Sequence, residues 1–174
     1  DDTTEEKPIR YAERVQDKRI NFLITSMMQD VIQRGTGVKA RALNRSDIAG
    51  KTGTTNDQKD AWFSGFNPDV VATVWVGFDQ PRNLGRGEYG GTAALPIWID
   101  YMRTALQDSP QRGLKIPDGV TNVRIDPETG KRAKPGQPNA IFEYFREENV
   151  PAQEVDDDMI DPHTEGGSLP EQLF

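Results

Sequence analysis

A lysine flanked by glycine and threonine residues is the most chemically suggestive feature of this sequence. Gly50, Lys51 and Thr52 resemble the end of a phosphate-binding loop. The pattern of that loop begins with another glycine, five positions before Gly50. The chain has Arg45 where that first glycine is required. A helix should also follow the threonine, whereas Gly53–Asp57 is a poor helix start. We therefore disfavour nucleotide binding.

The tripeptide that begins one residue later, Lys51-Thr52-Gly53, suggests a different kind of site if it lies on a strand. A peptide can add as an extra strand to an open sheet edge when the edge residues permit close approach, as Gly53 does. The cation of Lys51 favours developing negative charge, and the hydroxyls of Thr52 and Thr54 can hydrogen-bond a terminal carboxylate. A lone lysine would more simply be a solvated side chain on a strand edge, so the neighbouring residues decide the interpretation.

Those neighbours carry a family resemblance. The segments concerned are residues 47–57, 60–66 and 75–79, together with 27–37 and 94–98. They closely resemble the class A, bifunctional penicillin-binding proteins, and the resemblance covers about residues 17 to 145. Lys-Thr-Gly is the third signature of the serine acyl transferases that include these proteins and the serine β-lactamases. The resemblance implies substrate binding by Lys51, Thr52, Gly53 and Thr54, with Lys51 catalytic and the Thr54 backbone N–H forming half of an oxyanion hole.

The other two signatures of that family are missing from this chain. No serine is followed three residues later by lysine, and no Ser-X-Asn occurs. The nucleophile serine is therefore absent, and we expect the chain alone to be inactive. The chain starts at Asp1 without Met, which leads us to expect a piece of a longer protein. By resemblance, the parent also carries the missing N-terminal half of the domain, a glycan-polymerising domain and a membrane anchor.

The resemblance also implies the partners and the location. The parent would be a peptidoglycan D,D-transpeptidase that cross-links stem peptides through a serine acyl-enzyme at the periplasmic face of the inner membrane. The parent would bind β-lactam antibiotics at the same site. The resemblance implies no cofactor and no metal. Two alternatives stay open. One is a non-catalytic interaction module of a cell-wall protein, and the weaker one is a β-lactamase.

Hydrophobic periodicity predicts the elements that position this lysine. The expected elements are a helix over 17–34 with Asp17 as N-cap, a loop over 36–45, strands over 48–54, 61–66 and 70–78, and a helix over 93–107 capped by Thr92. Each helix has an apolar stripe at helical spacing, which consists of Ile20, Leu23, Ile24, Met27, Met28, Val31 and Ile32 in the first and of Leu95, Trp98, Ile99, Met102 and Leu106 in the second. The turn Asn67-Pro68-Asp69 should join the last two strands in a hairpin. The run from Val70 to Val76 barely alternates, which predicts a central strand covered on both faces.

These elements predict an α+β fold, an antiparallel β-sheet flanked by helices, as part of the transpeptidase fold. We expect three regions: 1–108 as the C-terminal half of the transpeptidase domain, 109–150 as a C-terminal extension, and 151–174 as an acidic disordered tail. Within the extension, short apolar segments around Val123 and Ile141–Phe145 flank the turn 126–130. Four aromatic residues on the strands and second helix are expected in the core: Trp62, Phe63, Trp75 and Trp98.

The charge is uneven along the chain. Seven of the 28 acidic residues lie in 151–174, which has no Lys or Arg, leaving 21 acids against 21 bases elsewhere. The absence of a basic stripe argues against nucleic-acid binding. His163 and the run Asp156–Asp158 in this tail are interpreted as solvated groups and not as a metal site. The chain has no cysteine and no apolar run long enough to span a membrane.

Overall fold

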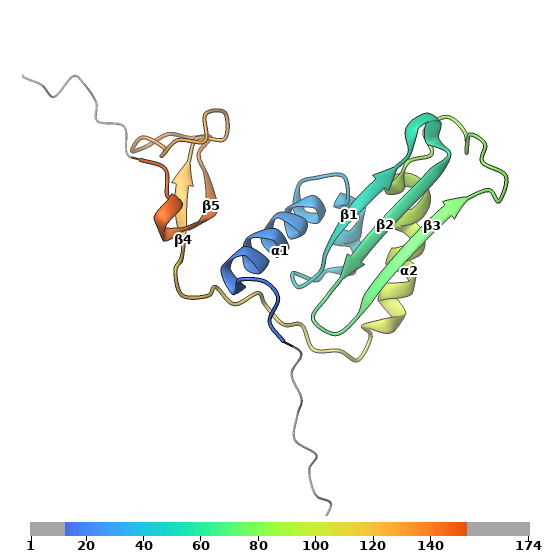
Figure 1. The fold of residues 1–174 in the computed structure, drawn as a ribbon, viewed down its shortest axis with the longest axis horizontal. Coiled ribbons are helices and arrows are strands. Elements are labelled where there is room, and N and C mark those ends of the chain that lie inside the picture. The colour runs from blue at the N-terminus through green and yellow to red at the C-terminus, as the bar shows by residue number, and fades with distance from the viewer. Residues whose placement is uncertain (1–12, 153–174) are drawn as a thin grey trace, which may run out of the picture. The chain divides into compact units, whose positions relative to one another are not determined.

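The computed structural model describes residues 13–152 and divides the chain into two compact units between Gly119 and Val120. The first unit contains a helix, three strands and a second helix in chain order (Figure 1). The second contains a two-stranded hairpin. The expected boundary at residue 108 remains a prediction.

The three strands of the first unit form one antiparallel sheet in the order β1-β2-β3. They are β1 (Ala49–Thr54), β2 (Asp60–Phe66) and β3 (Val71–Gly77). The register pairs Lys51 with Ser64 and Ser64 with Thr73. The side chain of Asn67 closes the β2–β3 turn by accepting hydrogen bonds from the backbone N–H groups of Asp69 and Val70 at 3.1 and 2.8 Å. The predicted hairpin is confirmed.

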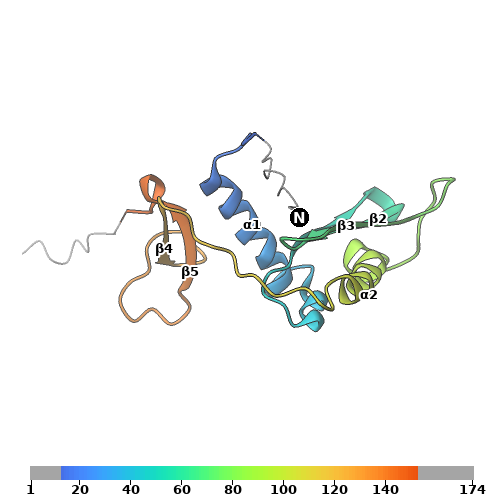
Figure 2. The same cartoon turned by 90° about the horizontal axis from the view of Figure 1, so that it is seen from below.

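Helix α2 (Leu95–Ala105) covers one face of this sheet (Figure 2). The predicted apolar stripe is buried along its whole length, and it consists of Leu95, Trp98, Ile99, Met102 and Leu106. The Trp98 ring packs edge-on to Phe63 of β2, with ring centroids 4.9 Å apart, and its indole N–H donates to the Ala72 carbonyl of β3. This contact is the centre of the core.

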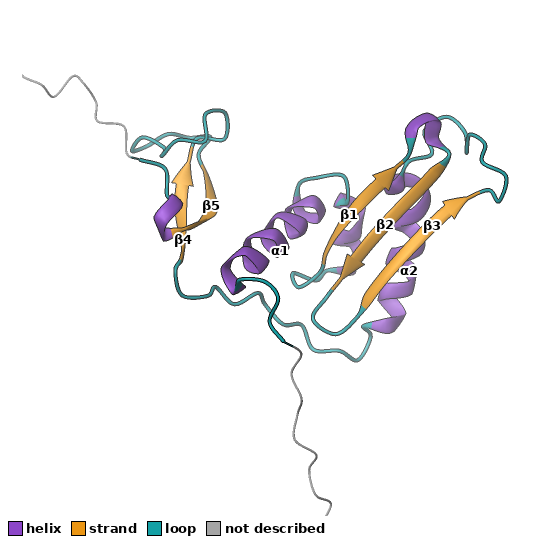
Figure 3. Ribbon diagram, viewed as in Figure 1, coloured by secondary structure: helices purple, strands orange, loops and turns teal. Residues whose placement is uncertain are grey.

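Helix α1 (Lys18–Gln33) lies alongside β1 (Figure 3). Its N-cap is Asp17, whose carboxylate accepts from the backbone N–H of Arg19 at 2.7 Å, as predicted. Ile32 is fully buried against the same core, whereas Ile24 and Met27 of the expected apolar stripe are exposed. Phe22, outside that stripe, is buried instead. The α+β class with helices flanking an antiparallel sheet is confirmed.

The prediction of a central, doubly covered strand at 70–78 is wrong for the part of the chain that the structure describes. Strand β3 is at the sheet edge, and its side chains alternate. Ala72, Val74 and Val76 pack on the core, while Val71 is 77% exposed and Trp75 is 44% exposed. The nearly continuous apolar run therefore has one covered face and one face that nothing in residues 13–119 covers.

The same uncovered face corrects the prediction for the aromatic residues. Phe63 and Trp98 are buried, but Trp62 and Trp75 are 40% and 44% exposed. These two rings lie on neighbouring strands with centroids 6.1 Å apart, and the Trp75 indole N–H donates to Asp60 at 2.9 Å. Aromatic residues on strands are core residues only on the face that another element covers.

Two local predictions also need correction. The expected loop at 36–45 contains a 3₁₀ helix, Val38–Leu43, which buries Ala40. The second helix is not capped by Thr92, because the helical path already begins with a π-helical turn, Gly90–Ala94. Thr92 instead accepts a hydrogen bond from the Tyr89 backbone N–H at 2.7 Å, inside that turn. Both differences concern short helical segments of five or six residues, which hydrophobic periodicity detects poorly.

The second unit is a hairpin of β4 (Val120–Ile125) and β5 (Ile141–Arg146). The turn after β4 is closed by a hydrogen bond from the Gly130 N–H to the Asp126 carbonyl at 2.8 Å, with Gly130 at φ 70°. Both expected apolar segments of the extension are thus strands. The interpretations of His163 and Asp156–Asp158, and the predicted disorder of the acidic tail, concern residues outside the described range, apart from Pro151 and Ala152.

Candidate active site

All four residues predicted to bind substrate lie on β1, the edge strand beside α1. The strand is buried at Ala49 and Gly50 and becomes accessible from Lys51, with Lys51 and Thr54 exposed. Because side chains alternate along a strand, Lys51 and Gly53 point to the uncovered face. Thr52 and Thr54 point to the other face. The structure therefore brings the four residues together on one accessible half-strand.

The backbone N–H and C=O groups of this half-strand point alternately toward β2 and away from it. The Thr55 N–H donates to the Asp60 carbonyl of β2 at 3.1 Å. Hydrogen bonds in an antiparallel pair involve every second residue, so Gly53 and Lys51 continue this ladder toward β2. The N–H and C=O groups of Thr52 and Thr54 then point away from β2, to the side on which no described strand pairs. These are the groups an added peptide strand would meet.

The Lys51 ammonium lies at this outer side. Its Nζ atom donates to the Thr52 carbonyl at 3.0 Å and lies 3.5 Å from the Thr52 hydroxyl. The lysine side chain is exposed and forms no ion pair in the part of the chain that the structure describes. A fixed positive charge beside outward-facing backbone donors is suited to an anionic group.

The two threonine hydroxyls are held by partners that the sequence analysis missed. Thr36, just after α1, shares a hydrogen bond of 2.8 Å with the Thr52 hydroxyl. The Gly90 N–H donates to the Thr54 hydroxyl at 3.1 Å. A threonine oxygen can accept while its own proton is donated elsewhere, so the Thr54 hydroxyl proton is still available to a ligand. The proton of Thr52 is equally available when Thr36 is the donor in their shared bond.

Gly90 must be a glycine at this place. A Cβ atom there would come within 2.3 Å of the Trp62 carbonyl and 2.7 Å of the Gly53 carbonyl. The turn before α2 therefore packs directly on the backbone of β1 and β2. The doubled glycine at 90–91 is the only sequence signal that could have indicated this contact.

A hollow of about 420 Å³ lies beside these hydroxyls, with Thr36, Thr52, Thr54, Tyr89 and Gly90 among its lining residues. Tyr89 is 48% exposed, and its hydroxyl accepts a hydrogen bond from the Gln58 side chain at 3.1 Å. Among residues 13–152 no group of three His, Cys, Asp or Glu side chains is arranged to hold a metal ion. In the same range no helix has the length and apolar character required to cross a bilayer.

Comparison with known proteins gives two family matches. Residues 2–103 match the sequence model of the penicillin binding protein transpeptidase domain. Residues 116–159 match that of the C-terminal domain of penicillin-binding protein 1A. The first match covers more than half of the chain.

Individual relatives agree with these matches. Penicillin-binding protein 1A of Pseudomonas aeruginosa is 61% identical over 140 residues, which are 80% of this chain and 17% of that protein. Its counterpart in Neisseria lactamica is 61% identical over 104 residues, 60% of this chain and 13% of that protein. The crystal structure of penicillin-binding protein 1A from Haemophilus influenzae superposes with a TM-score of 0.77 at 41% identity, covering 84% of this chain and 23% of that one. The chain thus spans less than a fifth of the length of these two sequence relatives.

Proposed function

The chain belongs to the penicillin-binding protein transpeptidase family, and from that premise we propose that it is the C-terminal part of a peptidoglycan D,D-transpeptidase whose serine nucleophile lies elsewhere in a longer parent. A role in peptidoglycan transpeptidation goes with the family. The serine mechanism, the binding of penicillin and the inactivity of this chain alone are parts of the proposal. So is the bifunctional character of the parent, with a second, glycan-polymerising domain.

One observation carries the proposal. Lys51-Thr52-Gly53 stands on the accessible half of an edge strand, with the backbone groups of Thr52 and Thr54 directed outward. A stem peptide can lie along this side as an added strand, main chain to main chain. Its terminal carboxylate would then meet the Lys51 ammonium and the hydroxyl protons of the two threonines.

The reaction has two acyl transfers. The oxygen of the parent's serine attacks the carbonyl carbon between the two terminal D-alanines, the C–N bond breaks, and the last D-alanine leaves with a proton on its nitrogen. An amine of a neighbouring stem peptide then attacks the resulting ester and releases the serine with its proton. Negative charge develops on the carbonyl oxygen in both steps. The Thr54 N–H is directed so that it can stabilise that charge.

The uncovered face of the sheet supports the idea of a missing part of the domain. Trp62, Val71 and Trp75 expose apolar surface there, on the same face as Lys51. Large adjoining apolar groups at a surface are typical of a site that another protein element covers. We assign that role to the parent's N-terminal half, which would bring the serine to the Lys51 side of β1.

The proposal includes partners and a location. Peptidoglycan stem peptides are the substrate, and β-lactam antibiotics acylate the same serine because their ring carbonyl is attacked in the same way. No cofactor, metal or nucleic acid takes part. The parent would be anchored in the bacterial inner membrane with this site on the extracytoplasmic face.

The experiment is a Lys51→Ala substitution in the full-length parent, followed by measurement of acylation by a fluorescent penicillin. Loss of a group that stabilises charge in the transition state typically slows such a reaction by about 10²- to 10³-fold. Lys18→Ala is the matched control, because Lys18 is a surface lysine at the start of α1. Full-rate acylation of a correctly folded Lys51→Ala parent would show that β1 has another role.

A further inference from the structure

A buried ion pair stands immediately before the proposed catalytic strand. Arg45 and Asp47 join through two parallel bonds, 2.8 Å from Nε to Oδ1 and 2.7 Å from the terminal nitrogen to Oδ2. The Asp47 side chain is fully buried, and that of Arg45 is 12% exposed. Removing two charges from water is costly, so such a pair is maintained only when further hydrogen bonds satisfy it. The proposed reaction uses neither residue.

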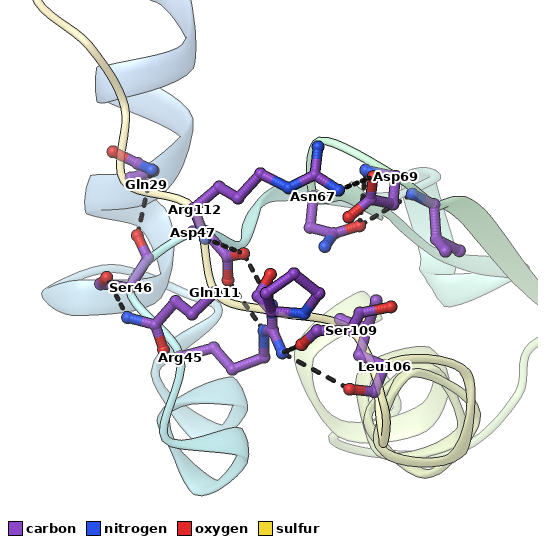
Figure 4. Close-up of polar contacts among 12 residues, drawn as sticks. Gln29, Arg45, Ser46, Asp47, Asn67, Asp69, Leu106, Ser109, Gln111 and Arg112 are labelled. Carbon is purple, nitrogen blue, oxygen red and sulfur yellow. Dashed lines mark hydrogen bonds and ion pairs between the residues drawn. The ribbon is translucent and has the colours of Figure 1, made fainter.

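The further hydrogen bonds come from the segment that follows α2 (Figure 4). The Arg45 guanidinium donates to the carbonyls of Ser109 at 2.9 Å and Pro110 at 3.2 Å. Asp47 accepts the backbone N–H of Arg112 at 3.1 Å. The planar fork of arginine can bind a carboxylate and carbonyls at once, which a lysine ammonium cannot do in the same geometry. Residues 109–112 are therefore fastened to the start of β1.

Neighbouring bonds connect the same place to two other elements. The Arg112 side chain binds Asp69 in the β2–β3 turn at 2.7 Å. Gln111 donates to the Ser46 hydroxyl at 2.5 Å, and Gln29 of α1 donates to the Ser46 carbonyl at 3.1 Å. Helix α1 and the segment after α2 thus both contact the residues that lead into β1, and that segment also binds the β2–β3 turn.

The electrostatics agree with this geometry. Burial alone would raise the pKa of Asp47, but the hydrogen bonds from Arg45 and from the Arg112 N–H, together with the Arg45 charge, hold that pKa below its ordinary value. The hydrogen bond to Asp47 raises the pKa of Arg45. Both groups are therefore charged at neutral pH.

We propose that Arg45 and Asp47 are positioning residues for the reaction that takes place at β1, and that residues 109–112 help to hold them in place. Lys51 lies four positions after Asp47, about 13 Å at the usual rise of a strand. Over that distance the pair fixes the direction in which the strand presents Lys51 and the Thr54 N–H. Errors of about 1 Å in such placement can cost 10²-fold in rate. The inference rests on the proposed function, because it takes β1 as the catalytic strand.

The test uses the full-length parent with the pair replaced by apolar residues of similar size, Arg45→Met with Asp47→Leu. Buried ion pairs can often be exchanged in this way without loss of stability. We expect this variant to fold, with a melting temperature lowered only by the loss of the hydrogen bonds to residues 109–112. The limiting rate of acylation by a fluorescent penicillin should fall by about ten- to a hundredfold, with a smaller change in the dissociation constant of the initial complex.

The matched control is the exposed pair on α2, Asp100→Leu with Arg103→Met, which should change neither quantity. A second variant, Arg45→Lys, keeps the charge and removes the fork, and its limiting rate should also fall. This variant decides the matter if the apolar pair does not fold. A wild-type limiting rate in either folded variant would overturn the inference.

The outcome can be separated from the fate of the proposed function. An unmodified parent that is not acylated, or a Lys51→Ala parent that is acylated at full rate, would refute the proposed function itself. An acylated parent that is slowed by Lys51→Ala but unaffected by the apolar pair would refute the positioning role alone.

Discussion

The two halves of strand β1 differ in almost every property. The first half, Ala49 and Gly50, is buried and is preceded by Ile48 and Asp47, which are buried as well. The second half, from Lys51 to Thr54, is accessible and contains all the proposed chemistry. The comparison shows how a strand can be fixed at one end and exposed at the other. Substitutions that break the buried Arg45–Asp47 pair or overpack the first half should lower stability, and those in the second half should change reactivity.

The largest effect on stability is expected at Asp47. Truncation by Asp47→Ala leaves the Arg45 guanidinium buried without its carboxylate, and breaking a buried pair in this way costs about 3–5 kcal/mol. Chemical denaturation of this chain, followed by circular dichroism, measures the loss. An Asp100→Ala variant is the control, since its pair with Arg103 is exposed and contributes at most about 1 kcal/mol. Equal losses in the two variants would contradict the anchoring role of the first half.

The glycines of the two halves give a second comparison. A Cβ atom at Gly50 would come within 2.7 Å of the Phe63 ring and 2.9 Å of the Ser64 carbonyl, so Gly50→Ala should destabilise by about 1–3 kcal/mol through overpacking. At Gly53 the nearest atom is the Trp62 Cβ at 3.2 Å, on the uncovered face. Gly53→Ala should change stability by less than about 1 kcal/mol.

The readout of this pair of variants is twofold. Denaturation of this chain should rank Gly50→Ala as the less stable variant. Acylation of the parent should be slowed by Gly53→Ala, because a methyl group there obstructs the approach of a peptide strand. A stable Gly50→Ala variant combined with a fully reactive Gly53→Ala parent would mean that the two halves do not differ as described.

Acid should weaken the anchored half by a smaller amount. Because the folded-state pKa of Asp47 is lowered, its contribution to stability is present above the ordinary carboxyl pKa of 3.8 and is lost as pH falls through the folded value. The charged groups around it are Arg45, Asp69 and Arg112. Thermal melting between pH 7 and pH 2 should show this loss in the unmodified chain and a reduced loss in Asp47→Asn. The same acid sensitivity in both proteins would assign the effect to other carboxyl groups.

Local pattern was sufficient to predict the accessible half of β1, the hairpin that follows it and the buried stripe of α2. Each of these depends on neighbours within a few residues. The exposure of Trp62 and Trp75 could not be predicted in this way, because it depends on whether another element covers that face of the sheet.

The anchoring residues were missed for a related reason. Arg45 binds the carbonyls of Ser109 and Pro110, and Asp47 binds the backbone N–H of Arg112, 65 positions along the chain. No periodicity connects partners so far apart. Hydrogen bonds to backbone groups also do not depend on the residue type of the partner, so the sequence does not reveal them. The contact of Thr36 with Thr52 is also invisible in the sequence, since two threonines have no spacing signature.

The most direct test of the central claim is mass spectrometry of this chain and of its full-length parent after incubation with a penicillin. An acyl-enzyme requires an attacking oxygen, a base for its proton and donors for the oxyanion, and this chain provides Lys51 and the Thr54 N–H but no Ser-X-X-Lys. We predict one covalent adduct on the parent and none on the chain alone. A stoichiometric adduct on the isolated chain, or none on a folded parent, would contradict the account, and the second result would favour a non-catalytic interaction module.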